Sequence, residues 1–249
     1  MRNKILFFAV GAILGAGAFG LVWYTSLRTD PQHYLELIAQ AEQRCKVTET
    51  AGDPAPAVDP NSSKEQTFVF EPSALTVVSF FSRAPLEDIL GTNKEVSGEL
   101  VVDLRNPNKK AEGSLTIAMA GFQTGIDLRD EHLKDTKFLN VAAYPDATFE
   151  ITGVRTDQQI VLGKTSTGTI TGNFTLRGKT LPLSVPITAT YVLATPELKE
   201  IYVENNLLVI DGSFEVDLTQ YGMPGMQGLG GKKVSEKVQI TLKLAATEK

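Results

Sequence analysis

A dense group of charged residues interrupts a sequence in which apolar and polar residues otherwise alternate. It lies within residues 125–153 and includes Arg129, Asp130 and His132. The planar guanidinium of an arginine matches the geometry of phosphate, so Arg129 and Asp130 could position the polar head of a ligand at the mouth of a pocket. The alternative is a salt bridge or a turn cap that holds the break in shape.

His132 is one of two histidines in the chain, and no second histidine or cysteine stands at metal-ligand spacing from it. We therefore expect no metal site here, and interpret His132 either as a ligand contact or as part of a structural hydrogen bond. The sequence also lacks a G-x-S-x-G elbow, an H-E-x-x-H motif and a cysteine–histidine pair in its alternating region. These observations predict a protein that is not an enzyme and has no cofactor.

A glycine-rich segment at residues 221–233 looks at first like a nucleotide loop. A phosphate-binding loop would need a glycine where Met226 stands and a serine or threonine where Lys233 stands. We interpret the segment as a flexible flap over a pocket, with Met223 adaptable to an apolar ligand, or as a disordered loop.

From residue 67 onward the dominant period is two, which predicts an antiparallel sheet with one apolar and one solvated face. We expect eight to ten strands and one helical break between Arg129 and Asn140. Long alternating strands in series predict a barrel or a strongly curled sandwich. The pair Gly178-Lys179 marks a hairpin tip, and Pro182 and Pro186 on one polar face indicate an edge or a bulge.

A barrel of about eight strands is just wide enough to be filled by side chains or to hold one small ligand. Gly98 and Gly172 on the apolar faces either allow a tighter bend of the sheet or leave room for an apolar guest. Large aromatic rings at inward positions serve core packing, cavity lining or both, and they belong to Phe138, Phe149, Phe174 and Phe214.

Several motifs, taken in order, resemble the YceI-like family of bacterial polyisoprenoid-binding proteins. They are the run Leu128–Leu133, the turn Lys137–Asn140, the strand entry Tyr144–Phe149 and the hairpin Ile170–Thr180. The resemblance covers roughly residues 68–246. It implies a lipocalin-like antiparallel barrel whose long apolar cavity holds an isoprenoid chain, in a protein exported to the periplasm and without catalytic activity.

The charged break, the inward rings and the flap together supply the residues that we expect to contact an apolar lipid ligand. Within the charged break, the apolar residues are expected to touch the ligand more than the charged ones. The residues are Arg129, Asp130, His132, Leu133, Phe138, Phe149, Phe174, Leu176, Phe214, Tyr221 and Met223.

The amino terminus carries a membrane signal. Arg2 and Lys4 precede the uncharged run Ile5–Tyr24, which is long enough to cross a bilayer as a helix. Positive charge before the run keeps the N-terminus in the cytoplasm and sends the rest across the inner membrane. The alternative is a signal peptide cleaved near Ala16-Gly17-Ala18, which would release the protein into the periplasm.

Three parts follow from this organisation: an anchor or signal at residues 1–29, a helix and linker at 30–66, and the β-barrel domain at 67–249. The stretch Tyr34–Cys45 has one apolar stripe, which predicts a helix resting on the bilayer or on the domain, or a homodimer seam with an intermolecular Cys45 bridge. Thr48–Gln66 is rich in proline, alanine, serine and acidic residues, as in a solvated linker.

The net charge of −5 indicates that nucleic acid is not a partner. The sequence therefore predicts a membrane-tethered, exported barrel that binds an isoprenoid or similar long apolar lipid. The alternative hypothesis is a non-catalytic envelope interaction module in which the barrel is filled by its own side chains.

Overall fold

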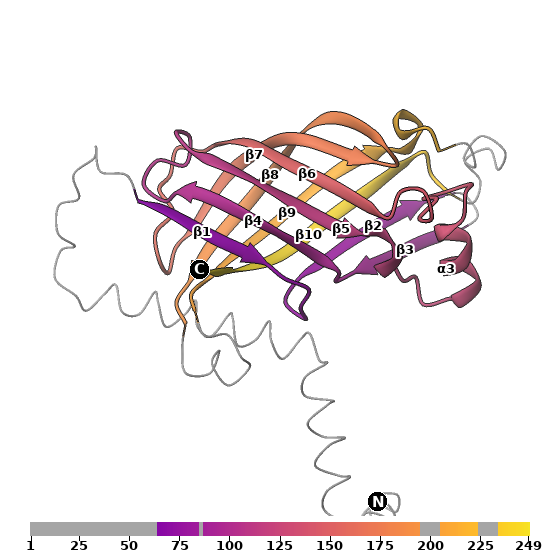
Figure 1. The fold of residues 1–249 in the computed structure, drawn as a ribbon, viewed down its shortest axis with the longest axis horizontal. Coiled ribbons are helices and arrows are strands. Elements are labelled where there is room, and N and C mark those ends of the chain that lie inside the picture. Colours follow the sequence, from indigo (N-terminus) through magenta and orange to yellow (C-terminus); the bar gives the residue numbers. More distant parts are fainter. Residues whose placement is uncertain (1–63, 85–86, 195–204, 224–233) are drawn as a thin grey trace, which may run out of the picture.

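The fold is an antiparallel β-barrel with one α-helix at one end (Figure 1). The structure is a computed structural model, and it describes residues 64–84, 87–194, 205–223 and 234–249. No helix within these ranges is long and apolar enough to cross a membrane. The expected anchor, the Tyr34–Cys45 helix and nearly all of the linker lie outside the described residues.

The described residues contain ten strands, which is the upper end of the predicted eight to ten. Between β5 and β6 lie a short 3₁₀ turn, Met119–Gly121, and the helix α3, Asp127–Lys134; a second 3₁₀ turn, Leu218–Tyr221, follows β9. The strands are β1 Glu65–Phe70, β2 Val77–Arg83, β3 Asp88–Asn93, β4 Val96–Asp103, β5 Ala111–Ala118, β6 Asp146–Arg155, β7 Thr165–Leu176, β8 Lys179–Val192, β9 Leu207–Asp217 and β10 Lys237–Glu248.

Eight strands close the barrel in the order β1-β4-β5-β6-β7-β8-β9-β10, and β10 returns to pair with β1. Only the end of β10 contacts β1, through the pair Phe70↔Ala246 and its neighbours. The earlier part of β10 pairs with β2, and β3 continues the wall beyond β2. The single bridge Thr92↔Gln123 then joins β3 to the segment before α3. The hairpin β2–β3 therefore extends the wall at the end of the barrel where α3 lies.

The helical break is shorter than the sequence predicted. It begins at Asp127 and ends at Lys134 rather than spanning Arg129 to Asn140. Asp135 is extended, and its carboxylate accepts the backbone N–H of Lys137 at 2.7 Å, which favours a turn over another helical residue. Asn140 then adopts a positive φ of 50°, so the chain turns toward β6.

Gly98 and Gly172, which the sequence suggested as possible room for a ligand, leave no empty space. A Cβ at Gly98 would lie 2.1 Å from the carbonyl oxygen of Ser114, and the φ of Gly98 is 150°. A Cβ at Gly172 would lie 2.2 Å from the oxygen of Glu150 and 2.7 Å from the ring of Phe149. The reading of these glycines as room for a guest was wrong, because the neighbouring strand and ring already fill that space.

Pro182 and Pro186 lie where β8 is paired on one side only. The ladder with β7 runs along all of residues 179–190, whereas the ladder with β9 begins at Ile187. The missing N–H of each proline therefore removes no bond to β9. β8 is not an edge strand of the sheet, but the half that carries the prolines is unpaired on one side, as at an edge. The hairpin tip is Arg177-Gly178, one residue earlier than expected, and both residues have positive φ.

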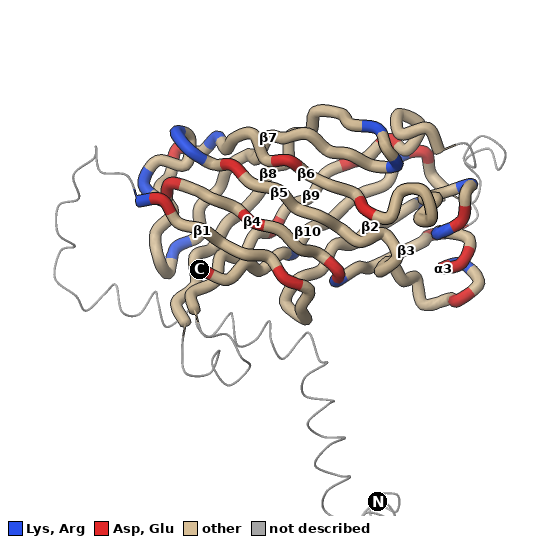
Figure 2. Tube along the Cα trace, in the orientation of Figure 1, with Lys and Arg blue, Asp and Glu red and all other residues tan. Residues whose placement is uncertain are grey.

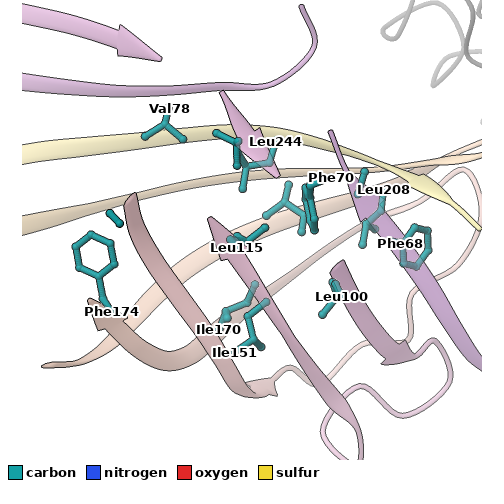
Figure 3. Close-up of a cluster of buried hydrophobic side chains, with 14 of the residues drawn as sticks. Phe68, Phe70, Val78, Leu100, Leu115, Ile151, Ile170, Phe174, Leu208 and Leu244 are labelled. Carbon is teal, nitrogen blue, oxygen red and sulfur yellow. The ribbon is translucent and has the colours of Figure 1, made fainter. Parts of the chain in front are cut away.

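The barrel interior is tightly packed at the end opposite α3. Figure 3 shows apolar side chains from many strands converging in the barrel interior, among them Phe68, Phe70, Leu100 and Leu208. Phe68 and Phe70 are 0% and 1% exposed, and the ring of Tyr191 meets that of Phe68 edge-on with centroids 5.6 Å apart. The hydroxyl of Tyr191 donates to Glu248 at 2.7 Å. Burial and that hydrogen bond raise the pKa of Tyr191 to about 12.

Candidate functional site

A cavity of about 510 Å³ occupies the half of the barrel that α3 covers. Its wall is largely apolar, since the inward positions of alternating strands carry Val, Ile, Leu, Phe and Met. About half of its lining residues lie on strands that are far apart in sequence. The strand residues that line it are Val78, Phe80, Ser82, Ile89, Ile117, Ala147, Phe174, Leu176, Phe214, Val216, Val238, Ile240 and Leu242.

The cavity ends at a single layer of residues across the barrel. On β5 the lining includes Ile117 but not the next inward residue, Leu115, and on β10 it includes Leu242 but not Leu244. On β6 it includes Ala147 but not Phe149, whose ring covers Gly172. We call Leu115, Phe149 and Leu244 the floor layer, because the packed half of the barrel begins there.

Aromatic rings support the cavity wall from β2, β7 and β9. Phe174 contacts the ring of Phe214 at 6.4 Å between centroids and that of Tyr221 at 5.7 Å, both close to perpendicular. The ring centroids of Phe80 and Phe122 lie 5.5 Å apart, and the two rings are tilted by 58°. Tyr221 packs behind Phe174 and is buried, which raises the pKa of its hydroxyl. Such edge-to-face pairs hold the rings in defined orientations.

The charged break forms a corner around Thr124. The carboxylate of Asp130 accepts the backbone N–H and the hydroxyl of Thr124, at 2.8 and 2.5 Å. The guanidinium of Arg129 donates to the hydroxyl and carbonyl oxygens of Thr124, at 2.9 and 3.1 Å, and to Glu87 at 2.5 Å. This network joins α3 to the loop before β3. Arg129 and Asp130 therefore hold the break in shape, which is the structural alternative to contact with a ligand head group.

The cavity opens to the surface beside α3. Ile126 and Leu128 line it, yet they are 51% and 61% exposed. His132, also exposed, lines the same opening together with Glu87 and Arg129. Figure 2 shows acidic and basic residues mixed around α3. The opening is therefore an apolar rim with a few polar groups, most of which already bind one another.

Arg177 ties the rim of the cavity together from the hairpin β7–β8. Its guanidinium donates to the carbonyl oxygen of Thr136, which follows α3, at 2.8 Å, and to that of Gly222, which follows β9. Its Nε is buried and has no hydrogen-bond partner among the described residues. One side chain thus holds two loops that border the opening.

Eight of the eleven residues named from the sequence line the cavity: Arg129, His132, Leu133, Phe138, Phe174, Leu176, Phe214 and Met223. Three do not. Asp130 points to Thr124, Phe149 belongs to the floor layer, and Tyr221 lies behind Phe174. Residues 224–233 of the expected flap lie outside the described residues.

The lining residues that the sequence did not indicate lie mostly on β2, β3 and the approach to α3. They include Val78, Phe80, Ile89 and Phe122. The stretch Val77–Phe81 is apolar on both faces apart from one serine, so its alternation is hard to see. Thr124 carries no signal by itself, because its role depends on Arg129 and Asp130, which lie five and six residues further along the chain.

Across the described ranges, no group of three or more His, Cys, Asp or Glu side chains could hold a metal ion. The cavity wall contains few polar groups, and Arg129 is engaged in the corner. The arrangement is suited to hold an apolar molecule by burial rather than to polarise one.

Comparison with known proteins agrees with this architecture. Residues 59–246 match the family described as YceI-like domain. Over 97 residues the chain is 36% identical to a UPF0312 protein of Enterobacter sp. (strain 638) and 35% identical to Protein YceI of Salmonella arizonae. These alignments cover 39% of this chain and 46% and 47% of those proteins, so the chain matches about half the length of its curated relatives.

Solved structures share the fold at low sequence identity. Burkholderia cenocepacia BcnA matches with a TM-score of 0.56 at 20% identity, over 69% of this chain and 96% of that one. A polyisoprenoid binding domain from Saccharophagus degradans matches with a TM-score of 0.57 at 14% identity, over 75% and 100%. The Campylobacter jejuni YCEI protein matches with a TM-score of 0.52 at 16% identity, over 67% and 89%.

Proposed function

We propose a lipid-binding function for this chain, which belongs to the YceI-like domain family. In this proposal the barrel takes the apolar chain of an isoprenoid or similar lipid into the cavity beside α3. The observation that carries it is an apolar cavity of about 510 Å³ inside an otherwise packed barrel. Empty apolar space of that size lowers stability, so its persistence favours a use.

Binding energy would come from burial of the lipid chain. Each methylene group that leaves water for the cavity contributes about 0.8 kcal/mol. The cavity wall offers no dense set of free charges, since Arg129 already donates to Thr124 and Glu87. The polyisoprenoid-binding domain from Saccharophagus degradans, which has the same fold, supports this class of ligand.

The alternative of an interaction module with a filled barrel is less well supported. The half of the barrel under α3 is hollow, whereas a module that only presents its outer surface has no need of a cavity. The donors and acceptors of the corner bind one another, which does not favour a catalytic role.

The place of action that we propose is the cell envelope. The uncharged run Ile5–Tyr24 after Arg2 and Lys4 supports export, with the barrel tethered to the inner membrane or, after cleavage, free in the periplasm. Protease protection of the barrel in intact cells, and its loss once the outer membrane is opened, would test this placement.

Native mass spectrometry of the full chain purified from cells tests lipid binding. We expect an added lipid mass that disappears on denaturation, and we expect Ala147→Leu to reduce its occupancy because Ala147 is 1% exposed and lines the cavity. Ala142→Leu, at an exposed position between α3 and β6, is the matched control and should keep the lipid. A folded wild-type protein that carries and takes up no lipid would contradict the proposal.

A further inference from the structure

We propose that the floor layer sets a limit of about 15–20 carbons on the length of chain that the barrel can enclose. This inference rests on the proposed function and adds to it the size class of the ligand. It follows from the position of the cavity in only one half of the barrel, and from the side chains that close it.

The volume of the cavity gives the number of carbons. A water molecule takes ~30 Å³ in the liquid and a methylene group is of similar size, so a cavity of about 510 Å³ encloses about 17 carbons. A chain of about 40 carbons would need about 1,200 Å³ by the same measure. The interior beyond the floor layer offers no such space, because Phe68 and Phe70 are almost completely buried there.

The floor layer is built from the strands themselves and cannot move aside as a loop can. Leu115 lies opposite Phe149 across the β5–β6 ladder, and Phe149 lies opposite Phe174 across the β6–β7 ladder. The ring of Phe149 covers Gly172, where any side chain would collide with it. A chain that enters beside Leu128 therefore meets side chains held by paired strands on both sides.

The consequence is a limit on the length of lipid chain that the protein can extract from a membrane. A chain that fits leaves the bilayer for an equally apolar cavity with little change in free energy. Each further methylene group that the barrel cannot cover is exposed to water and reduces extraction from the bilayer by about fourfold. Extraction should therefore be nearly independent of length up to the limit and fall steeply beyond it.

The test incubates delipidated full-length protein with phosphatidylcholine vesicles that contain one primary alcohol at a time, and measures occupancy by native mass spectrometry. Saturated alcohols of twelve to twenty-four carbons are compared with geranylgeraniol (four isoprene units) and solanesol (nine isoprene units). We expect similar occupancy up to about 17–20 carbons and a loss of about tenfold or more for each two carbons beyond that. Solanesol should not be extracted.

Two variants locate the limit. Phe149→Ala should move it upward by about five carbons, because deletion of its large, partly buried ring leaves on the order of 150 Å³. Phe81→Ala is the matched control, since Phe81 faces outward opposite Leu90 and Gln239, and it should leave the limit unchanged.

Extraction of solanesol as efficiently as geranylgeraniol would overturn the length limit and leave the proposed function standing. Failure to extract an alcohol of any length would instead contradict the proposed function. The wild-type series decides the proposal even if Phe149→Ala does not fold.

Discussion

At the scale of single residues, the charged side chains of the motif near α3 bind one another around Thr124. Arg129 and Asp130 together satisfy the backbone N–H, the carbonyl and the hydroxyl of that residue. Thr124 precedes the turn into α3 and both of its partners lie in α3, so these hydrogen bonds keep the rim of the cavity in one shape. The fork geometry of the arginine guanidinium is used here for structure.

Arg129→Ala is expected to lower the free energy of unfolding by about 1–3 kcal/mol, because hydrogen bonds from a charged donor to Thr124 and Glu87 are lost in a site that is largely shielded from water. The side chain of Arg129 is 23% exposed. The measurement is urea denaturation followed by circular dichroism.

Arg83→Ala provides the comparison. Its ion pair with Asp88 is 3.9 Å long, and both side chains are mostly exposed, so its removal should change stability by less than about 0.5 kcal/mol. Equal effects of the two substitutions would show that the corner around Thr124 contributes no more than a surface ion pair.

Tyr191 gives the barrel a dependence on alkaline pH. Its pKa is raised to about 12, so above pH 10 the unfolded chain loses the proton while the folded protein keeps it. The contribution of Tyr191 to stability is complete below pH 10 and is lost as the pH rises through 12. Tyr191→Phe should flatten the fall in unfolding free energy between pH 10 and 12, measured by denaturant titration at each pH. A slope equal to that of the wild type would contradict this assignment.

At the scale of elements, the β7–β8 hairpin does more than connect two strands. Its tip carries Arg177 and Gly178 with φ values of 52° and 74°, a left-handed turn that suits the twist of the strands. A Cβ at Gly178 would lie 2.6 Å from the ring of Tyr144. The turn thus brings the Arg177 guanidinium to the loops after α3 and after β9.

Arg177→Ala is expected to speed amide hydrogen exchange at Asn140 and Gly222 by about tenfold or more, since hydrogen bonds from a charged donor contribute about 1.5–3 kcal/mol. Exchange within the β7–β8 ladder should remain unchanged. Arg155→Ala, an exposed arginine on β6, is the control. Equal exchange at Asn140 and Gly222 in the two variants would show that Arg177 does not hold the two loops together.

At the scale of the whole molecule, the barrel is divided into a packed half and a hollow half. Phe70 belongs to the packed half and is 1% exposed, whereas Phe214 lines the cavity and is only partly buried. The packed end therefore supplies most of the stability, whereas the proposed lipid binding belongs to the other end of the same sheet.

In the lipid-free protein, Phe70→Ala should lower the free energy of unfolding by about 3–5 kcal/mol, because a large ring is removed from close packing. Phe214→Ala should have less than half that effect, since one side of its ring already faces empty space. Thermal and urea denaturation of the two variants would measure the difference. Comparable losses would mean that both halves are equally packed.

The sequence indicated some features of this protein without help from the structure. Period-two alternation is a property of adjacent residues, so it predicted eight to ten antiparallel strands and the inward positions of Phe174, Leu176 and Phe214. The motif between Leu128 and Phe149 predicted the family and a helix at that point, although α3 ends at Lys134 because Asp135 starts a turn.

Only the tertiary structure decided where the barrel is hollow. Alternation places Phe149 and Phe174 on the same inward face, yet one closes the cavity and the other lines it, because the ring of Phe149 lies over Gly172 on the next strand. The partners of Arg177 lie 41 and 45 residues away along the chain, which no local pattern reports. Local periodicity determines which way a side chain points, whereas the space in front of it depends on strands that meet only when the barrel closes.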